Sequence, residues 1–506
     1  MLLDGNPTIR LNAADDVVIA RASLPPGTRL DGEGISTTAT VPAGHKVATR
    51  PIAPGEPVRR YNQVIGFATT AIAPGDHVHT HNLAMGDFER DYAHASEYQP
   101  TSPADTPATF MGYRRADGRV ATRNYLGVLS SVNCSAHVCR LIAREVEQLL
   151  GDYPNIDGVV PIQHKTGCCM NATGEPIDVL RRTLGGFAVH PNFHSVLLVG
   201  LGCEVNQVDT LLDAQGLQQS QQLKAFTIQD SGGTRKTIAR GVAALREMLP
   251  DANRVAREPV PASELIVGLE CGGSDGYSGI SANPALGAAV DELVRHGGTG
   301  ILSETPEIYG AEHLLTRRAV SREVGEKLIA RIRWWEDYTA RLNGEMNNNP
   351  TPGNKQGGLT TILEKSLGAV AKGGTTGLMD VYEYAERVTA KGFVFMDTPG
   401  YDPVSITGQV AGGANLVCFT TGRGSAYGCK PSPSLKLATN SALYASQEED
   451  MDINCGTVVD GSESIEQNGR KVFDMMLRVA SGEQTKSEQF GYGEDEFAPW
   501  VLGPTM

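Results

Sequence analysis

The sequence lacks any long apolar run, and none of its hydrophobic stretches approaches the ~20 residues needed to cross a bilayer. Its first residues, MLLDGNPTIRLNAADD, also lack the basic segment followed by an apolar run that defines a signal peptide. These two absences predict a cytoplasmic protein with no membrane partner. Aromatic residues are scarce at 6%, whereas glycine is abundant, with 58 residues in 506, and this composition favours many tight turns between strands and helices.

Basic residues are in the minority: 44 Lys and Arg stand against 58 Asp and Glu, for a formal net charge of −14. This balance argues against nucleic acid and anionic membrane surfaces as partners. A small acidic substrate remains compatible with it, because a local group of Arg and Lys side chains inverts the field at one cleft. The nine cysteines are an odd number and do not cluster in a small stapled domain. We interpret them as reduced thiols of a cytosolic protein, some of them candidate metal ligands.

Residues 1–93 are predicted to form a compact all-β module. Short alternating runs such as VVIARA and HKVATRPI are separated by Pro-Gly and Gly turns, and no long 3.6-residue period appears. The segment 94–109 is rich in Pro, Ser and Thr and has no periodicity, so it is predicted to be an extended linker.

From residue 110 onwards, apolar strands alternate with amphipathic helices, which predicts parallel sheets covered on both faces. A Pro-containing stretch at 257–263 separates a middle α/β domain, 110–256, from a C-terminal α/β domain, 257–506. The strand candidates are NYLGVLSS (124–131), DGVVPI (157–162), SVLLVGL (195–201), KAFTI (224–228), ELIVGLE (264–270), GTGILSE (298–304), GFVFMD (392–397) and NLVCFTT (415–421). The helix candidates are 136–150, 235–249 and 318–342.

Cysteines follow four of these strands. Cys134 follows NYLGVLSS, Cys168 and Cys169 follow DGVVPI, Cys203 follows SVLLVGL, and Cys271 directly follows ELIVGLE. Ligands of parallel α/β sheets bind at the carboxyl ends of strands, so these thiols are expected to converge on one metal ion or iron–sulfur cluster. The alternative is that each is a small buried residue near a strand end.

Histidines alternate in GDHVHTHN, where His77, His79 and His81 are two residues apart. On a strand such residues share a face, and imidazoles gathered there bind a metal or move protons. The competing interpretation is an exposed polar face. His45, after a glycine turn and beside Lys46, indicates little on its own.

The segment LECGGSDGYSGISANP (269–284) places Glu270 at a strand end and then a Gly, Ser and Asp run that opens towards a helix. Such a loop presents backbone N–H groups to an anion, and its acids, Glu270 and Asp275, suit a metal ligand or proton carrier. A plain turn is the alternative. TTGRGSAYG adds Arg423, a bidentate partner for a carboxylate, and NPTPGNK adds Lys355.

Nucleotide binding is not supported by the glycine spacing. Gly200-Leu-Gly202 has Val205 where the dinucleotide fingerprint requires its third glycine, and no P-loop pattern occurs. The G-x-S-x-G elbow of serine hydrolases is also missing.

Taken together, these segments resemble the altronate/galactarate dehydratases over nearly the whole chain. The resemblance implies an N-terminal SAF-type β-clip on a flexible linker, a middle domain that forms a homodimer, and an unusual Rossmann-like C-terminal domain. It also implies dehydration of sugar acids to 3-deoxy-2-keto acids with Fe²⁺, in some cases Mn²⁺, under reducing conditions. The matching segments are PAGHKVA (42–48), GYRRADGRVATRN (112–124), TGC (166–168), GLGCE (200–204), LECGGSDGYSGISANP (269–284), PGNKQGG (352–358), TTGRGSAYG (420–428) and MDINCGT (451–457).

Within the family, GDHVHTHN, LECGGSDGYSG and PEIYGAEHLL are more similar to the altronate branch than to the galactarate branch. CKPSP at 429–433 and Cys455 depart from both, which leaves the choice of aldonate or aldarate open. A related lyase that eliminates sulfite and a non-catalytic sugar-acid sensor are the alternative functions.

The mechanism that the resemblance suggests is removal of the proton α to the carboxylate, with loss of the β-hydroxyl, next to a metal ion. Cys134, Cys168 and Cys203 are then expected to bind iron, as a mononuclear ion or, alternatively, an iron–sulfur cluster. Glu270 is expected to be a further ligand or the base. The remaining predicted roles are catalytic for His45, His79 and His81, and substrate-binding for Ser274, Asp275, Lys355 and Arg423.

Overall fold

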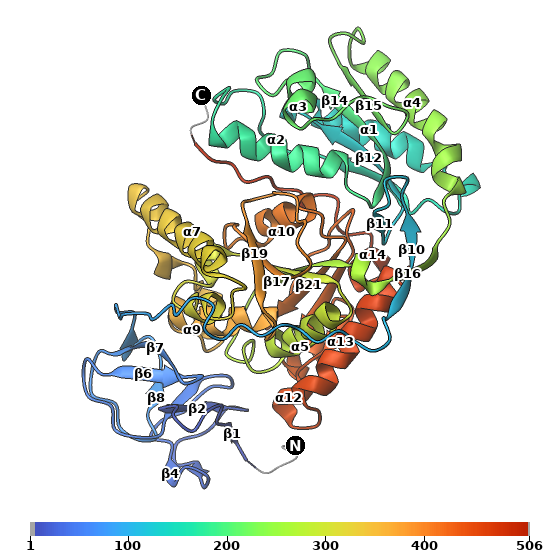
Figure 1. The fold of residues 1–506 in the computed structure, drawn as a ribbon. Helices are drawn as coiled ribbons and strands as arrows, with labels where there is room; N and C mark the ends of the chain where they lie inside the picture. The colour runs from blue at the N-terminus through green and yellow to red at the C-terminus, as the bar shows by residue number, and fades with distance from the viewer. Residues whose placement is uncertain (1–5, 504–506) are drawn as a thin grey trace.

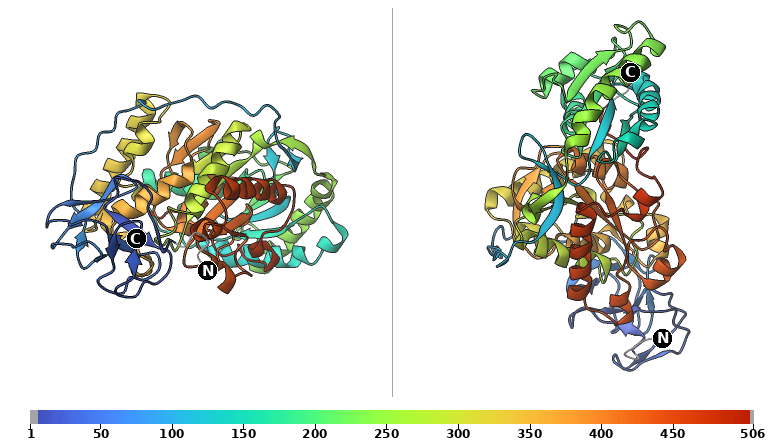
Figure 2. Two further views of the ribbon diagram at one scale, coloured as in Figure 1. Left: turned by 90° about the horizontal axis from the view of Figure 1, so that it is seen from below. Right: turned by 90° about the vertical axis from the view of Figure 1, so that its right-hand side faces the viewer.

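The computed structural model describes residues 6–503 and consists of three domains. The C-terminal domain lies in the centre, with the N-terminal β-module at one end and the middle domain at the other (Figures 1 and 2). This arrangement confirms the predicted fold class, an all-β module followed by α/β domains with parallel sheets. No helix among the described residues is both long and apolar enough to cross a membrane.

The N-terminal module is built from short antiparallel strands, joined by the Pro-Gly and Gly turns that the sequence indicates. One sheet has the order β1-β2-β5-β8, a second has the order β6-β7-β9, and β3 and β4 form a hairpin. Alternate residues of β2 point into different cores, since Val18 packs with Leu30 and Val47, whereas Val17 packs towards the rest of the molecule. The strands are β1 (Thr8–Ile9), β2 (Val17–Ala20), β3 (Arg29–Leu30), β4 (Ile35–Ser36), β5 (Lys46–Ala48), β6 (Pro57–Arg60), β7 (Gln63–Ala68), β8 (His77–Val78) and β9 (Leu83–Ala84).

The segment 94–109 is extended and runs across the C-terminal domain to the middle domain (Figure 1). Its backbone is held there, because Ala95 N–H donates to Thr316 O at 2.9 Å and Ala104 N–H donates to Arg295 O at 2.9 Å. A small antiparallel sheet of order β11-β10-β16 follows, in which the strand that enters the middle domain, β10, pairs with the strand that leaves it, β16. Its strands are β10 (Thr109–Arg114), β11 (Val120–Ala121) and β16 (Glu258–Pro261).

The middle domain contains a four-stranded parallel sheet of order β13-β12-β14-β15. Apolar residues of α1 and α4 form one core with the sheet, and those of α2 and α3 form another, so helices cover both faces as predicted. The elements are β12 (Tyr125–Ser130), α1 (Ala136–Glu147), β13 (Gly158–Ile162), α2 (Glu175–Ala188), β14 (Phe193–Gly200), α3 (Val208–Ala214), β15 (Leu223–Thr227) and α4 (Thr234–Arg254).

The C-terminal domain contains a seven-stranded parallel sheet of order β19-β20-β18-β17-β21-β22-β23. Residues of α5 and α13 belong to the core on one face, whereas α10 packs on the other face and against α2 of the middle domain. That helix contact is close, because a Cβ on Gly186 would lie 2.3 Å from Ala411 O. The strands are β17 (Ile266–Cys271), β18 (Thr299–Leu302), β19 (Leu378–Tyr382), β20 (Gly392–Met396), β21 (Leu416–Thr421), β22 (Ser434–Ala438) and β23 (Ile453–Asn454). The helices are α5 (Ala282–Arg295), α6 (His313–Thr316), α7 (Arg322–Arg341), α8 (Pro352–Gln356), α9 (Ile362–Ala369), α10 (Asp402–Ala411), α11 (Ser441–Ser446), α12 (Thr457–Asp460), α13 (Ile465–Ala480) and α14 (Lys486–Gln489).

Candidate active site

Three carboxylates converge at the carboxyl edge of the C-terminal sheet. Glu270 is the penultimate residue of β17, Glu304 follows the adjacent strand β18, and Asp402 begins α10 after β20. One oxygen from each lies within 4.8 Å of the other two. The carboxyl ends of parallel strands are where α/β folds place ligands, so this group, which we call the carboxylate group, is the primary candidate for chemistry.

Two oxygens of the carboxylate group are buried without a hydrogen-bond partner, Oε1 of Glu270 and Oε1 of Glu304. The other oxygen of Glu270 accepts a hydrogen bond of 2.9 Å from Ser405 Oγ. Burial and the neighbouring Glu304 raise the pKa of Glu270 well above its usual value, and burial with the same neighbour raises the pKa of Asp402 to about 7. Unpaired buried carboxylate oxygens are costly, so a cation between them fits this donor set.

Two buried lysines offset part of this negative charge. Lys372 Nζ lies 3.1 Å from Glu304 Oε2 and 2.9 Å from Cys271 Sγ, and Lys365 Nζ lies 2.6 Å from Glu307 Oε1. Cys271 is the one cysteine predicted after a strand that joins this group, with its Sγ 3.5 Å from Glu307 Oε2. Burial raises the pKa of Cys271 well above its usual value.

Two backbone positions of the site have restricted conformations or restricted space. Glu304 has φ +68°, a left-handed conformation that costs about 1–3 kcal/mol for a residue of this type, and its N–H is held by Thr398 Oγ1 at 2.8 Å. Gly272 has no room for a side chain, because a Cβ there would lie 2.1 Å from Asp402 Oδ2. A glycine directly after β17 therefore lets Asp402 approach Glu270.

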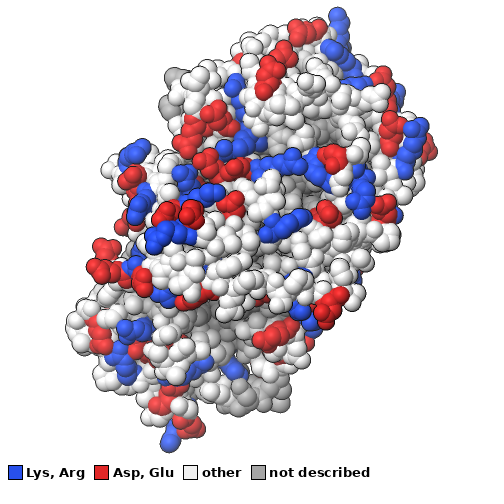
Figure 3. Space-filling view, viewed as in Figure 1, with Lys and Arg blue, Asp and Glu red and all other residues white. Residues whose placement is uncertain are grey.

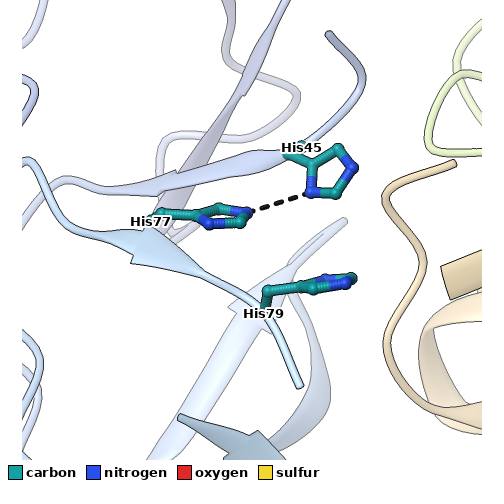
Figure 4. A group of neighbouring side chains, drawn as sticks. All are labelled: His45, His77 and His79. Carbon is teal, nitrogen blue, oxygen red and sulfur yellow. Dashed lines mark hydrogen bonds between the residues drawn. The ribbon is translucent and has the colours of Figure 1, made fainter. Parts of the chain in front are cut away.

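The histidines form a second group, contributed by the N-terminal module (Figure 4). His45 precedes β5, His77 begins β8 and His79 follows it, and one ring nitrogen from each lies within 4.8 Å of the other two. A hydrogen bond of 2.9 Å joins His45 Nδ1 and His77 Nε2, and the rings of His77 and His79 stack with centroids 5.4 Å apart. We call these three residues the histidine group. His81 lies at its exposed edge, with its ring centroid 5.4 Å from that of His77.

The histidine group is kept neutral by its surroundings. Burial lowers the pKa of His77 to about 4 and that of His79 to about 3, and it also lowers the pKa of His45. Nδ1 of His79 is buried and has no hydrogen-bond partner. Neutral imidazoles with a free lone pair are fit to accept a proton or to bind a metal.

The turn that carries His45 is pressed against the C-terminal domain. His45 Nε2 lies 3.0 Å from the carbonyl oxygen of Gln356 at the end of α8. The carbonyl oxygen of Gly44 would lie only 2.0 Å from a Cβ on Gly276 and 2.4 Å from one on Gly358, so both of these positions require glycine. This contact explains why Gly276 and Gly358, which are distant from His45 in the sequence, are glycines.

A cavity of about 460 Å³ opens beside this contact. Gly273, which follows Gly272, lies close to Arg423, since a Cβ on it would lie 3.2 Å from Arg423 Cβ. Arg423 is exposed at the cavity and donates to Gln356 Oε1 at 3.0 Å. Residues lining the cavity include Arg21, Asp275, Gln356, Arg423, Asn440 and Asp460.

The other predicted substrate-binding residues differ in their surroundings. The Asp275 carboxylate is buried and accepts hydrogen bonds from Ser278 and Thr439, so it organises the loop after β17. Ser274 is buried, and its carbonyl oxygen accepts a hydrogen bond of 2.8 Å from Asn354 Nδ2. Lys355 is half-buried on α8, next to Gln356.

The predicted iron ligands Cys134, Cys168 and Cys203 lie in the middle domain, after β12, β13 and β14. The Sγ atoms of Cys168 and Cys169 are 3.9 Å apart, and the contact with Cys169, burial and Cys134 together raise the pKa of Cys168 to about 11. Cys168 and Cys169 line a cavity of about 620 Å³ that shares no lining residue with the cavity at Arg423. The structure thus places these three cysteines in the middle domain and Glu270 in the C-terminal domain.

Sequence reasoning missed most of the carboxylate group and its lysines. Glu304 ends the predicted strand segment GTGILSE, so the strand-end rule applied to the cysteines would also have indicated it. Asp402, Lys365 and Lys372 carry no such signal, because each lies on or beside a helix whose position only the fold defines.

Buried carboxylates at the carboxyl edge of a parallel sheet are typical of the ligand sites of α/β enzymes. Three family models match successive parts of the chain. They are the altronate/galactarate dehydratase SAF domain over residues 6–86, the D-galactarate dehydratase/altronate hydrolase second domain over 112–253, and the D-galactarate/altronate dehydratase C-terminal domain over 262–505.

Curated relatives match over most of their length. A galactarate dehydratase (L-threo-forming) of Escherichia coli strain K12 is 38% identical over 96% of this chain and 94% of its own, and an altronate dehydratase of the same strain is 35% identical over 96% and 97%. The beta subunit of a (2R)-sulfolactate sulfo-lyase from Chromohalobacter salexigens is 32% identical over 76% of this chain and 96% of its own. The chain belongs to the galactarate/altronate dehydratase family and is a hydro-lyase of the sugar-acid dehydratase class.

Proposed function

We propose that this enzyme removes water from an aldonate or aldarate such as altronate and yields the 2-keto-3-deoxy acid, with a divalent iron ion held by Glu270, Glu304 and Asp402. The observation that carries the proposal is that these three carboxylates converge and that two of their own oxygens are buried without a hydrogen-bond partner. Carboxylate oxygens suit Mn²⁺, the alternative ion, and Fe²⁺ is the ion that the resemblance to the family implies. The prediction of thiol ligands for this ion is therefore replaced by an oxygen-ligand site.

When bound, the cation would act as a Lewis acid against the negative charge that develops on the substrate carboxylate as the α-proton leaves. The side chains around the proposed ion site partly neutralise its negative charge. Lys372 and Lys365 pair with Glu304 and Glu307, so the carboxylate group is not left with its full negative charge. Ser405 donates to one oxygen of Glu270, and the other oxygen has no hydrogen-bond partner.

The histidine group is proposed to take up the α-proton. At neutral pH the His79 imidazole is uncharged, and its Nδ1 has no hydrogen-bond partner, so it has the form that a general base requires. His81, at the exposed edge, would pass the proton to solvent. The β-hydroxyl leaves as water after it gains a proton, and the enol that remains tautomerises to the 2-keto acid.

The test is a turnover assay with anaerobically purified protein. We expect formation of a 2-keto-3-deoxy acid from altronate with Fe²⁺, weaker turnover with Mn²⁺, and loss of activity after chelation that added Fe²⁺ restores. Galactarate and stereoisomeric aldonates form the comparison panel. Full turnover of metal-free protein would contradict the ion site, and no turnover of any aldonate or aldarate would contradict the substrate class.

Arg423 is proposed to bind the substrate carboxylate through its planar guanidinium. Replacing it by methionine, Arg423→Met, should raise KM about 30- to 100-fold, which corresponds to ~2–3 kcal/mol for a charged hydrogen-bonded pair. Steady-state kinetics measure this effect. Arg322→Met, at an exposed position of α7, is the matched control and should leave KM unchanged. Equal KM values for the two variants would remove Arg423 from the substrate site.

The similarity to a sulfo-lyase subunit supports one alternative, elimination of sulfite from a sulfonated hydroxy acid at the same site. Both reactions start by removal of an α-proton and differ in the leaving group. Incubation with sulfolactate and an assay for sulfite distinguishes them, because a sugar-acid dehydratase releases none.

We also propose that the enzyme is a cytoplasmic homodimer that associates through the middle domain. The nine cysteines are all free thiols, which suits a reducing compartment. Positive and negative side chains are interspersed over the face shown in Figure 3, so substrate attraction depends on local residues such as Arg423. Light scattering of the intact protein would measure the assembly, and a monomer at micromolar concentration would contradict it.

A further inference from the structure

Helix α10 directs three polar side chains towards the C-terminal sheet. Asp402, Ser405 and Gln409 are three and four residues apart, and this spacing places side chains on one face of a helix. Asp402 belongs to the carboxylate group, and Ser405 Oγ donates to Glu270 Oε2 at 2.9 Å. Gln409 is fully buried one turn further along the helix, where its hydrogen bonds go to atoms outside the carboxylate group.

The side-chain amide of Gln409 has one orientation that fits its neighbours. Its Nε2 donates to two backbone oxygens, Leu269 O and Ile301 O, at 3.3 Å each, and to Ser303 Oγ at 2.5 Å. Carbonyl oxygens only accept hydrogen bonds, so the amino end of the amide must face them. The other end, Oε1, lies against Gly268, where a Cβ would be only 2.3 Å away. The backbone of β17 and β18 therefore fixes the direction in which Gln409 donates.

This direction is passed from Gln409 to Glu270 through two hydroxyl groups. Ser303 Oγ accepts from Gln409 and lies 2.8 Å from Ser405 Oγ, so its own proton is available for Ser405. A carboxylate that binds a cation is ionised and only accepts, so Ser405 must donate to Glu270. A hydroxyl group has one proton, and Ser405 must therefore accept from Ser303. Each member of the chain donates towards Glu270.

A second branch reaches Ser405 from the backbone of Glu304. Thr398 Oγ1 accepts from Glu304 N–H at 2.8 Å and donates to Ser405 Oγ at 2.9 Å, whereas its other acceptor, Pro399 O, is 3.1 Å away. The proton and both acceptor sites of Ser405 Oγ are then in use. Because Glu304 has the left-handed backbone conformation, this branch ties the unusual backbone of one proposed ion ligand to the carboxylate of another, Glu270.

The network is shielded from water, since Ser303, Thr398, Ser405 and Gln409 are each at most 1% exposed. In such surroundings each hydrogen bond polarises the next, and water does not compete for the donors. Hydrogen bonds behind metal ligands orient these ligands, and their loss typically weakens metal binding about 10- to 100-fold. The oxygen of Glu270 outside the network, Oε1, is the buried atom without a hydrogen-bond partner.

We propose that Gln409 is a positioning residue for the ion site and acts through Ser303 and Ser405. It directs the Ser405 hydroxyl at Oε2 of Glu270, so that Oε1 of the same carboxylate is left for the cation. This role rests on the proposed function, in which Glu270 and Glu304 are ligands of the ion. It adds to that function two residues, Gln409 and Ser303, that act on the ion only through hydrogen bonds.

The test measures the affinity of metal-free, full-length protein for Mn²⁺ from the electron paramagnetic resonance signal of free Mn²⁺. Gln409→Met removes the amide donor and nearly keeps the size of the side chain, and Ser303→Ala removes the first hydroxyl. Each variant should raise the Kd for Mn²⁺ about 10- to 100-fold. Because both residues act through one chain, adding Gln409→Met to Ser303→Ala should change the Kd by no more than about two-fold.

Thr407→Val is the matched control, because Thr407 is a buried hydroxyl residue of the same helix with unrelated partners. Its Oγ1 donates to Pro403 O at 2.7 Å and accepts from Ala498 N–H at 3.0 Å. This variant should keep the native Kd for Mn²⁺. Thermal melting establishes that each variant is folded, and Ser303→Ala alone tests the network if Gln409→Met does not fold.

Glu304→Gln, measured in the same series, separates this proposal from the proposed function. Weaker Mn²⁺ binding in Glu304→Gln together with a native Kd in folded Gln409→Met or Ser303→Ala would refute the network and leave the ion site intact. A native Kd in all three variants would refute the ion site as well. Losses that multiply in the double variant would show that Gln409 does not act through Ser303 and would overturn its proposed role.

Discussion

Replacing Glu304 by glutamine, Glu304→Gln, should lower kcat by about 10³-fold, equivalent to ~4 kcal/mol of lost transition-state stabilisation. The substitution keeps the size of the side chain but removes a charge from the carboxylate group, where one of its oxygens has no partner and the other accepts from Lys372. It thus removes a proposed ligand of the cation and leaves Lys372 without its carboxylate partner. Metal content and single-turnover kinetics measure the two consequences separately.

Glu326→Gln is the matched control for this experiment, because Glu326 is exposed on α7 and only pairs with Arg322. It should keep both the activity and the divalent-ion content. Thermal melting of Glu304→Gln establishes that the variant is folded. Native kcat and native metal content in the folded variant would refute the assignment of the ion to the carboxylate group.

Replacing Glu364 by alanine, Glu364→Ala, should destabilise the protein by about 3–5 kcal/mol, because it breaks a buried ion pair network from one side. Glu364 is fully buried on α9 and accepts from Lys46 Nζ at 2.8 Å and Arg60 Nη1 at 2.7 Å, both from the N-terminal module. Its removal leaves two buried cations without a carboxylate. Chemical denaturation with a probe in each domain measures the loss.

This variant should also reduce turnover, because α9 links the two groups of the active site. Glu364 faces the N-terminal module, whereas the next residue, Lys365, pairs with Glu307 beside the carboxylate group. Loss of the pair with Lys46 releases the strand that follows His45. Glu326→Ala serves as the control, and a Glu364→Ala protein of native stability would show that this network does not hold the N-terminal module.

The same network predicts a dependence of stability on acid. Burial alone would raise the pKa of Glu364, but Lys46 and Arg60 outweigh it and lower the pKa from 4.5 to about 2. Because the folded-state pKa is below the unfolded-state value, the stabilisation is complete above pH 4.5 and is lost as the pH falls towards 2. The free energy of unfolding of Glu364→Ala should therefore change less over this interval than that of the native sequence.

Local sequence patterns predicted many of the strands and helices, and they indicated that functional side chains lie at the carboxyl edge of a parallel sheet. Apolar runs such as DGVVPI and NLVCFTT became buried parallel strands, because a fully covered strand has no polar face to alternate with. The rule that ligands gather at strand ends indicated Glu270, which the structure places in the carboxylate group. Turn residues indicated the N-terminal module, since short strands are defined by where the chain must reverse.

Tertiary structure alone decided which of these ends meet. Glu304 joins Glu270 because β18 is paired with β17, and Asp402 joins them because α10 packs on that face; neither fact follows from local periodicity. The thiols lie apart from the carboxylates because the two parallel sheets are separate, although both obey the same pattern along the chain. Periodicity reports burial of each segment, whereas the order of strands depends on long-range packing between segments, and this packing determines which side chains share a site.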